Sequence, residues 1–134
     1  MPYADLREFL YRLEKEGELA HVSNPVDLHY EIGAVCRKTL DLSGPALSFG
    51  NIRGHNIPLV VNLFATRRRY AMAIDTTPEK LHAHWTEHIQ KPVQPIWVKS
   101  GPCKENIIIG KDADLMKFPI PIWNEFDGGP FITL

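Results

Sequence analysis

The sequence has little cysteine, almost no net charge and no long apolar run. Its two cysteines, Cys36 and Cys103, are too few and too far apart for a disulfide framework or a zinc site, so we expect two reduced thiols in a cytoplasmic protein. Fifteen Lys and Arg residues against sixteen Asp and Glu give a formal charge of −1. That balance argues against nucleic-acid binding. We also expect no membrane span and no signal peptide, because no apolar run approaches the roughly 20 residues that a membrane helix needs.

The remaining composition is that of an ordinary globular domain. Of the 134 residues, 44% are hydrophobic and 23% are charged, which excludes intrinsic disorder. A chain of this length fits one domain and can bury a real core. Phosphate-binding loops of the GxxxxGK[ST] or GxGxxG type do not occur in the sequence.

Apolar spacing predicts helices and strands in the first 90 residues. Apolar side chains recur from Leu6 to Leu13 with a 3.6-residue period, which predicts a helix over residues 5–16. Asp5 is its expected N-cap and Gly17 its stop. Further helices are expected over residues 27–40 and 66–74. A fourth helix is expected to start from an N-cap at Thr77, with an inner face of Leu81, Trp85, His88 and Ile89. Strands are expected over residues 18–23, 46–49 and 57–64. Cys36 falls on the apolar face of the second helix, so packing explains it better than reactivity.

The last third is rich in proline, which excludes a long helix and favours extended segments. Short strands are expected over residues 96–98 and 106–109. Residues 130–134 are typical of a strand that has only begun, so the chain is expected to stop in mid-structure.

Three consecutive arginines, Arg67, Arg68 and Arg69, form the tightest charge cluster. Guanidinium groups can bind phosphate or carboxylate in a bidentate manner. Successive residues of a helix point about 100° apart, however, so the three cannot all face one ligand. Salt-bridged or solvated arginines are the favoured interpretation, with an anion site as the alternative.

Histidines and a cysteine are the other candidates for chemistry. His84 and His88 lie four residues apart on an expected helix, a spacing that can hold a metal, but there is no HExxH motif and no obvious third ligand. A metal-dependent enzyme is therefore a further hypothesis, and we expect no bound metal. Cys103 stands beside Lys104, an arrangement that can activate a thiol, but no histidine adjoins it.

Two adjacent glycines, Gly128 and Gly129, follow Asp127. They suit either a tight turn or a loop facing a ligand, and the turn is the favoured interpretation. Taken by themselves, none of these residues assembles an acid, a base and an electrophile stabiliser in one place.

An ordered series of short motifs extends over nearly the whole chain. The motifs are DLREFL at residues 5–10, GEL at 17–19, PVD at 25–27, GPAL at 44–47, NLF at 62–64, TRRRY at 66–70, GPCKE at 101–105, DADL at 112–115, PIP at 119–121 and DGGPFIT at 127–133. This series resembles the N-terminal part of the UbiD family of decarboxylases. Ala65 is a departure, since glycine is expected before the three arginines.

The resemblance implies reversible, non-oxidative decarboxylation of an aromatic or α,β-unsaturated carboxylic acid. It also implies prenylated FMN as cofactor, anchored with the help of a divalent metal such as Mn and of K. In the family, the flavin, metal and catalytic motifs lie downstream of residue 134 in a split β-barrel domain. We therefore assign no catalytic, cofactor-binding or metal residue in this chain, although Gly128, Gly129 and Thr133 are expected near the edge of the pocket.

These observations predict an α+β fold with helices packed on a small mixed sheet, ending at the start of a missing split β-barrel domain. Residues 1–125 are expected to form the N-terminal domain and residues 126–134 the entry into the barrel. The leading hypothesis is a domain or fragment that is inactive alone and belongs to a complete enzyme that forms a homo-oligomer. The alternative is a non-catalytic small subunit that docks onto a separate barrel-bearing chain, because the apolar segment 131–134 could add a strand to a partner's sheet.

Overall fold

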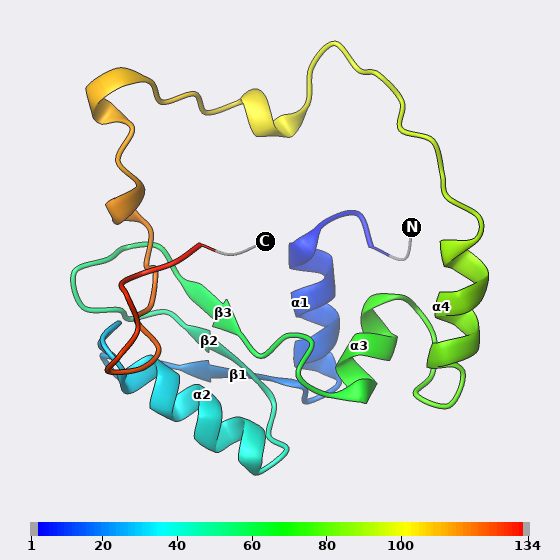
Figure 1. The fold of residues 1–134 in the computed structure, drawn as a ribbon, viewed down its shortest axis with the longest axis horizontal. Helices are drawn as coiled ribbons and strands as arrows, with labels where there is room; N and C mark the ends of the chain where they lie inside the picture. Colours follow the sequence, from blue (N-terminus) through cyan, green and yellow to red (C-terminus); the bar gives the residue numbers. More distant parts are fainter. Residues whose placement is uncertain (1–2, 133–134) are drawn as a thin grey trace.

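The computed structural model describes residues 3–132, in which helices surround a small sheet and are followed by a long extended segment (Figure 1). The helices are α1 (Leu6–Lys15), α2 (Glu31–Asp41), α3 (Arg67–Ala73) and α4 (Leu81–Ile89), and the strands are β1 (Leu19–Val22), β2 (Ala46–Phe49) and β3 (Leu59–Val61). The expected α+β class with a small mixed sheet is confirmed.

The sheet has the order β1-β2-β3 and mixes both kinds of pairing. β1 runs parallel to β2, with Leu19 opposite Ala46, and the connection between them contains α2. β2 runs antiparallel to β3, with Leu47 opposite Val61. A parallel pair needs a crossover connection, and α2 supplies it.

Two apolar clusters hold the helices against the sheet. The first lies between α2 and the sheet and includes Ile32, Cys36 and Phe49. The second lies among α1, β1 and α3 and includes Leu13 and Met72. Cys36 is 5% exposed within the first cluster, which confirms that it is a packing residue.

The starts of α1 and α3 follow local capping chemistry. The Asp5 carboxylate accepts a hydrogen bond from the N–H of Glu8 at 3.1 Å, which confirms Asp5 as the N-cap of α1. Thr66 caps α3 in the same way through the N–H of Arg69 at 3.2 Å. Gly17, with φ of +70°, takes the left-handed conformation that ends α1.

The expected start of the second helix was wrong by one turn, because α2 begins at Glu31 and not at residue 27. Residues 27–30 are instead drawn into long-range backbone pairing, as His29 forms a parallel bridge with Ile122. Tyr30 has φ of +66° and ψ of −31°, values incompatible with a helix.

The last helix also starts later than expected. Residues 77–80 form a turn in which the N–H of Lys80 donates to the carbonyl of Thr77 at 3.1 Å, so α4 begins at Leu81 and Thr77 is not its N-cap. The expected inner face of α4 is not covered by the described part of the chain, since Trp85 is 48% exposed and no residue of α4 is buried.

The predicted strands beyond β3 were wrong. Residues 96–98 and 106–109 lie extended and unpaired, because a strand needs a neighbour and none lies beside them in the described structure. The segment after α4 instead contains short 3-10 helices at Pro102–Lys104, Gly110–Asp112 and Leu115–Lys117. The strand expected over residues 57–64 is shorter, and residues 130–132 are in no strand; Thr133 and Leu134 lie outside the described residues.

Candidate functional site

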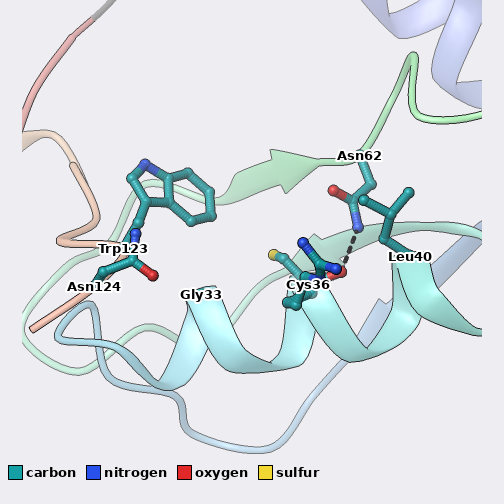
Figure 2. A pocket seen from close by; sticks show the side chains of 7 residues that line it. Gly33, Cys36, Leu40, Asn62, Trp123 and Asn124 are labelled. Atoms are coloured by element: carbon teal, nitrogen blue, oxygen red, sulfur yellow. Dashed lines mark hydrogen bonds between the residues drawn. The ribbon is translucent and has the colours of Figure 1, made fainter.

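An open hollow of about 450 Å³ lies where α2, the end of β3 and the returning C-terminal segment meet (Figure 2). Figure 2 shows the indole of Trp123 standing over α2 at Gly33. The lining residues are Gly33, Cys36, Arg37, Leu40, Asn62, Trp123 and Asn124. Four of them come from α2, so this helix forms the floor of the hollow.

Backbone contacts hold Trp123 in place. Its neighbour Ile122 donates its N–H to the carbonyl of Leu28 at 3.0 Å and accepts from the N–H of Tyr30 at 2.9 Å. A Cβ added to Gly33 would stand 2.5 Å from the carbonyl oxygen of Trp123. Only a residue without a side chain therefore allows this approach.

A turn closes the segment beyond Trp123. The Asp127 carboxylate accepts from the N–H of Trp123 at 3.1 Å and from the N–H of Asn124 at 2.9 Å. The N–H of Asp127 in turn donates to the carbonyl of Asn124 at 3.1 Å. These bonds make a turn that ends at Asp127, just before Gly128 and Gly129, so the choice between a turn and a ligand-facing loop at the two glycines stays a prediction.

The polar groups of the hollow are already paired. The side-chain amide of Asn62 donates to the carbonyl of Cys36 at 3.0 Å, and the Arg37 guanidinium bonds Asp41 at 3.0 Å. Burial raises the pKa of the Cys36 thiol to about 11, so the thiol stays protonated and is a poor nucleophile near neutral pH. The hollow therefore holds no acid–base pair.

The three arginines are separated by the fold as expected. Arg69 is 1% exposed and bonds the carboxylate of Glu18 at 2.8 Å and the carbonyl of Gly44 at 3.0 Å. Arg68 pairs with the carboxylate of Glu16 at 3.1 Å, and Arg67 donates to the carbonyl of Pro78 at 3.3 Å. The salt-bridged interpretation is confirmed for Arg68 and Arg69, since their guanidinium groups are occupied by the protein itself.

His84 and His88 lie together at the edge of a second hollow, of about 650 Å³, which Trp85 and Val93 also line. Their rings stack with centroids 4.0 Å apart, and Nδ1 of His88 lies 2.7 Å from the carbonyl oxygen of His84. Nδ1 of His88 therefore donates to this carbonyl, and Nε2 is the nitrogen of that ring that remains for a ligand. Across residues 3–132, no three His, Cys, Asp or Glu side chains gather as a metal site would require.

The segment from residue 91 to residue 118, which we call the arm, is the largest exposed apolar feature. It leaves the end of α4, runs across the top of the view away from the sheet and returns near the start of α2 (Figure 1). Trp97 is fully exposed and Val93 is 93% exposed. Exposed Cys103 lies on the first turn of the arm. Apolar exposure on this scale marks an interaction surface.

Two family models match consecutive parts of the chain. The model described as the 3-octaprenyl-4-hydroxybenzoate carboxy-lyase N-terminal domain matches residues 10–89. The Rift-related domain of the same carboxy-lyase matches residues 96–134. The fold and these matches correspond to the N-terminal region of the carboxy-lyases that the two models describe. The chain belongs to the UbiD family.

Solved structures of the family have the same fold over almost the whole chain. An evolved dimeric form of the UbiD-class enzyme HmfF from Pelotomaculum thermopropionicum, in complex with prFMN, is 32% identical with a TM-score of 0.86, over 98% of this chain and 31% of that one. Vanillic acid decarboxylase from Sedimentibacter hydroxybenzoicus is 34% identical with a TM-score of 0.80, over 96% and 30%. The 3,4-dihydroxybenzoic acid decarboxylase from Enterobacter cloacae is 29% identical with a TM-score of 0.84, over 97% and 30%. The chain thus spans less than a third of the length of these relatives.

Sequence reasoning missed the hollow and its residues Gly33, Asn62 and Trp123. One signal was present, because glycine inside a helix costs about 1 kcal/mol and therefore needs a packing reason. The reason lies ninety residues away in Trp123, which no local pattern indicates. Between residues 3 and 132, no helix is long and apolar enough to cross a membrane.

Proposed function

We propose that this chain is the N-terminal α+β domain of a cytoplasmic UbiD-like enzyme. The reaction of the complete enzyme is the reversible, non-oxidative decarboxylation of an aromatic or α,β-unsaturated carboxylic acid. The observation that carries the proposal is the pair of carboxy-lyase matches, at residues 10–89 and 96–134, supported by relatives that are decarboxylases of aromatic acids by name.

The catalytic groups belong to the part of the enzyme beyond this domain. In this proposal, residues 1–125 form the domain and residues 126–134 lead into the flavin-binding barrel, with Gly128, Gly129 and Thr133 near the pocket. Support comes from the hollow over α2, whose Asn62 and Arg37 side chains are already paired and whose thiol is held protonated.

Prenylated FMN is the proposed cofactor of the complete enzyme, with a divalent metal such as Mn²⁺ and with K⁺. HmfF was solved with prFMN and with FMN, which supports the choice of flavin. The described residues of this chain do not fit these groups themselves. The hollow is open and has no unpaired buried side-chain polar atom for a phosphate, and the described residues gather no metal-binding cluster.

The proposal is tested by comparing the chain alone with the chain joined to its barrel-bearing part. Each is mixed with prenylated FMN, Mn²⁺ and K⁺, and is then given vanillate or 3,4-dihydroxybenzoate. We expect flavin absorbance and release of CO₂ only with the joined protein. In the reverse direction, we expect carbon from labelled bicarbonate to appear in the carboxylic acid when the phenolic product is supplied. Stoichiometric flavin on the chain alone would refute the assignment of the cofactor to the other part.

A second candidate is a non-catalytic small subunit that docks onto a separate barrel-bearing chain. Phe131 and Ile132 favour it, because they are 60% and 62% exposed and could add to a partner's sheet. Whether the reading frame continues past Leu134 separates the two candidates. A stop codon favours the subunit, whereas continuation into a barrel favours the domain. For the first candidate, we propose that the complete enzyme is a homo-oligomer.

A further inference from the structure

Helix α4, at the edge of the molecule, places two histidine rings side by side (Figure 1). His84 and His88 lie four residues apart, and residues with this spacing are neighbours on a helix surface. Their imidazole rings stack with centroids 4.0 Å apart and an interplanar angle of 22°. Both rings line the same hollow, together with Trp85 and Val93. The fold therefore presents two imidazoles to one small volume of solvent.

The ring of His88 is held in the tautomer that a metal ligand needs. Its Nδ1 donates to the carbonyl oxygen of His84 at 2.7 Å, so Nε2 is the nitrogen that keeps a lone pair. Histidines that bind metals almost always donate their other ring N–H to a carbonyl or carboxylate in this way, because the bond orients the ring and raises its basicity. His88 is exposed and His84 is partly exposed, so a metal ion can reach both rings from solvent.

The two nitrogen ligands define the kind of ion that would bind. Imidazole suits Zn²⁺, Cu²⁺ and Ni²⁺, whereas Mn²⁺ and Mg²⁺ prefer oxygen ligands. Two histidines four residues apart on one helix face are also the pair that binds zinc in the HExxH motif. The Asp75 carboxylate lines the same hollow but pairs with Arg12 at 3.3 Å, so we do not count it as a ligand. The pair thus supplies two protein ligands, and water would fill the other positions.

α4 is an element that a bound ion would stabilise. It has nine residues and none of them is buried. Helices shorter than about 12 residues are marginal in water without tertiary packing. An ion held by both rings binds only while the turn between them is helical, and a ligand that binds only the folded form stabilises it.

We propose that His84 and His88 form a two-histidine site for a divalent transition-metal ion such as Zn²⁺ or Ni²⁺, and that the ion stabilises the end of α4. The spacing alone led us to expect no bound metal. The structure adds the stacked rings and the hydrogen bond that orients His88. The inference does not rest on the proposed function, because it uses only residues of α4.

Calorimetric titration of the chain, prepared without a histidine tag, tests the site with Zn²⁺ and with Ni²⁺. We expect one ion per chain, bound more tightly than Mn²⁺. His84→Asn and His88→Asn should each weaken binding at least about tenfold, since even the loss of an outer-shell partner costs that much. Both side chains reach solvent, so both variants should keep the fold, which circular dichroism checks.

His82→Asn is the matched control. His82 lies on the same helix but lines a different hollow, with Arg67 and Tyr70, and its loss should leave the affinity unchanged. Absence of binding would overturn the proposal. Affinity that survives His84→Asn and His88→Asn, or that falls equally in His82→Asn, would overturn it too.

NMR of the unaltered chain tests the same site without a variant. Zn²⁺ should shift the ring resonances of His84 and His88 and leave those of His82 in place. With Zn²⁺ at about 100 times its Kd, amides of residues 86–89 that exchange through opening of the helix should exchange about 100-fold more slowly. Zinc shifts confined to other histidines would refute the assignment of the site, and unchanged exchange in the bound chain would refute the stabilisation of α4.

Discussion

Gly33 and Trp123 approach so closely that a Cβ on Gly33 would stand 2.5 Å from the Trp123 carbonyl oxygen. The contact joins the first turn of α2 to a segment ninety residues later. This contact fixes the point at which the chain returns to the helices and sheet after the arm. Both ends of the arm are therefore attached to the same domain (Figure 1).

Gly33→Ala should separate the two segments. Alanine raises helix propensity by about 1 kcal/mol, but a clash with backbone cannot be relieved by a side-chain rotation, so we expect a net loss of about 1–3 kcal/mol in unfolding free energy. Urea unfolding measures the loss, and NMR should show faster exchange of the Tyr30 and Ile122 amides.

Ala34→Gly on the same helix is the control for Gly33→Ala. It should cost about 1 kcal/mol through propensity alone and leave the Tyr30 and Ile122 amides protected. Unchanged protection in Gly33→Ala would show that the close approach to Trp123 does not depend on the bare Cα.

Tyr30 holds a positive φ of 66° at the start of α2, which disfavours any residue with a Cβ. Tyr30→Gly should therefore be more stable than Tyr30→Ala by about 1 kcal/mol, the reverse of the usual order. The pair is compared by urea unfolding, so that the loss of the Tyr side chain cancels.

Tyr11, an exposed residue inside α1, is the matched control for Tyr30. There the glycine variant should be about 1 kcal/mol less stable than the alanine variant. The same order at both positions would contradict a strained backbone at Tyr30.

Arg69→Ala should destabilise the domain by about 3–5 kcal/mol, because it leaves the Glu18 carboxylate and the Gly44 carbonyl without their buried partner. Arg68→Ala is the control. Its guanidinium is half exposed and pairs with Glu16 at 3.1 Å and with Glu18 at 3.3 Å, and each of these ion pairs is worth about 1 kcal/mol or less. Thermal or urea unfolding separates the two, and similar losses would refute a special role for the buried arginine.

The two cysteines should differ in reactivity. Cys103 is exposed and Cys36 is buried with its pKa raised to about 11, so iodoacetamide at neutral pH should label one thiol per folded chain. Peptide mass spectrometry should place that label on Cys103, with Cys36 labelled only after unfolding. Rapid labelling of Cys36 in the native chain would contradict its burial.

The same burial predicts a loss of stability in alkali. The pKa of Cys36 is about 11 in the folded chain against 9.0 as its ordinary value, so between these pH values the unfolded state loses a proton that the folded state keeps. Unfolding then releases a proton, and stability falls as pH rises from 9 towards 11. Cys36→Ala should show a shallower decline in urea titrations over this range, and an identical decline would refute the effect.

Some elements could be predicted from neighbouring residues because their causes are local. The apolar stripe from Leu6 to Leu13 and the Asp5 cap lie within the roughly three turns of α1 itself, and the observed helix, Leu6–Lys15, agrees with the prediction. The first residue of α2 could not be predicted in this way, because backbone bonds from Ile122 draw residues 28–30 out of the helix.

In the candidate site, too, features with local causes could be predicted and features that depend on tertiary packing could not. Cys36 was correctly interpreted as a packing residue because it lies on an apolar helical stripe. The burial of Arg69 and not Arg68 was unpredictable, since three identical neighbours differ only in the direction in which α3 points them.

The amino-acid order alone determined the family, the mixed α+β class, the N-cap of α1 and the apolar character of the arm, because motifs, periodicity and composition are properties of short stretches. The tertiary structure alone decided which arginine is buried, where α2 begins and which backbone carbonyl packs against Gly33. Those outcomes depend on atoms far apart along the chain meeting at hydrogen-bond distance, and only packing brings them together.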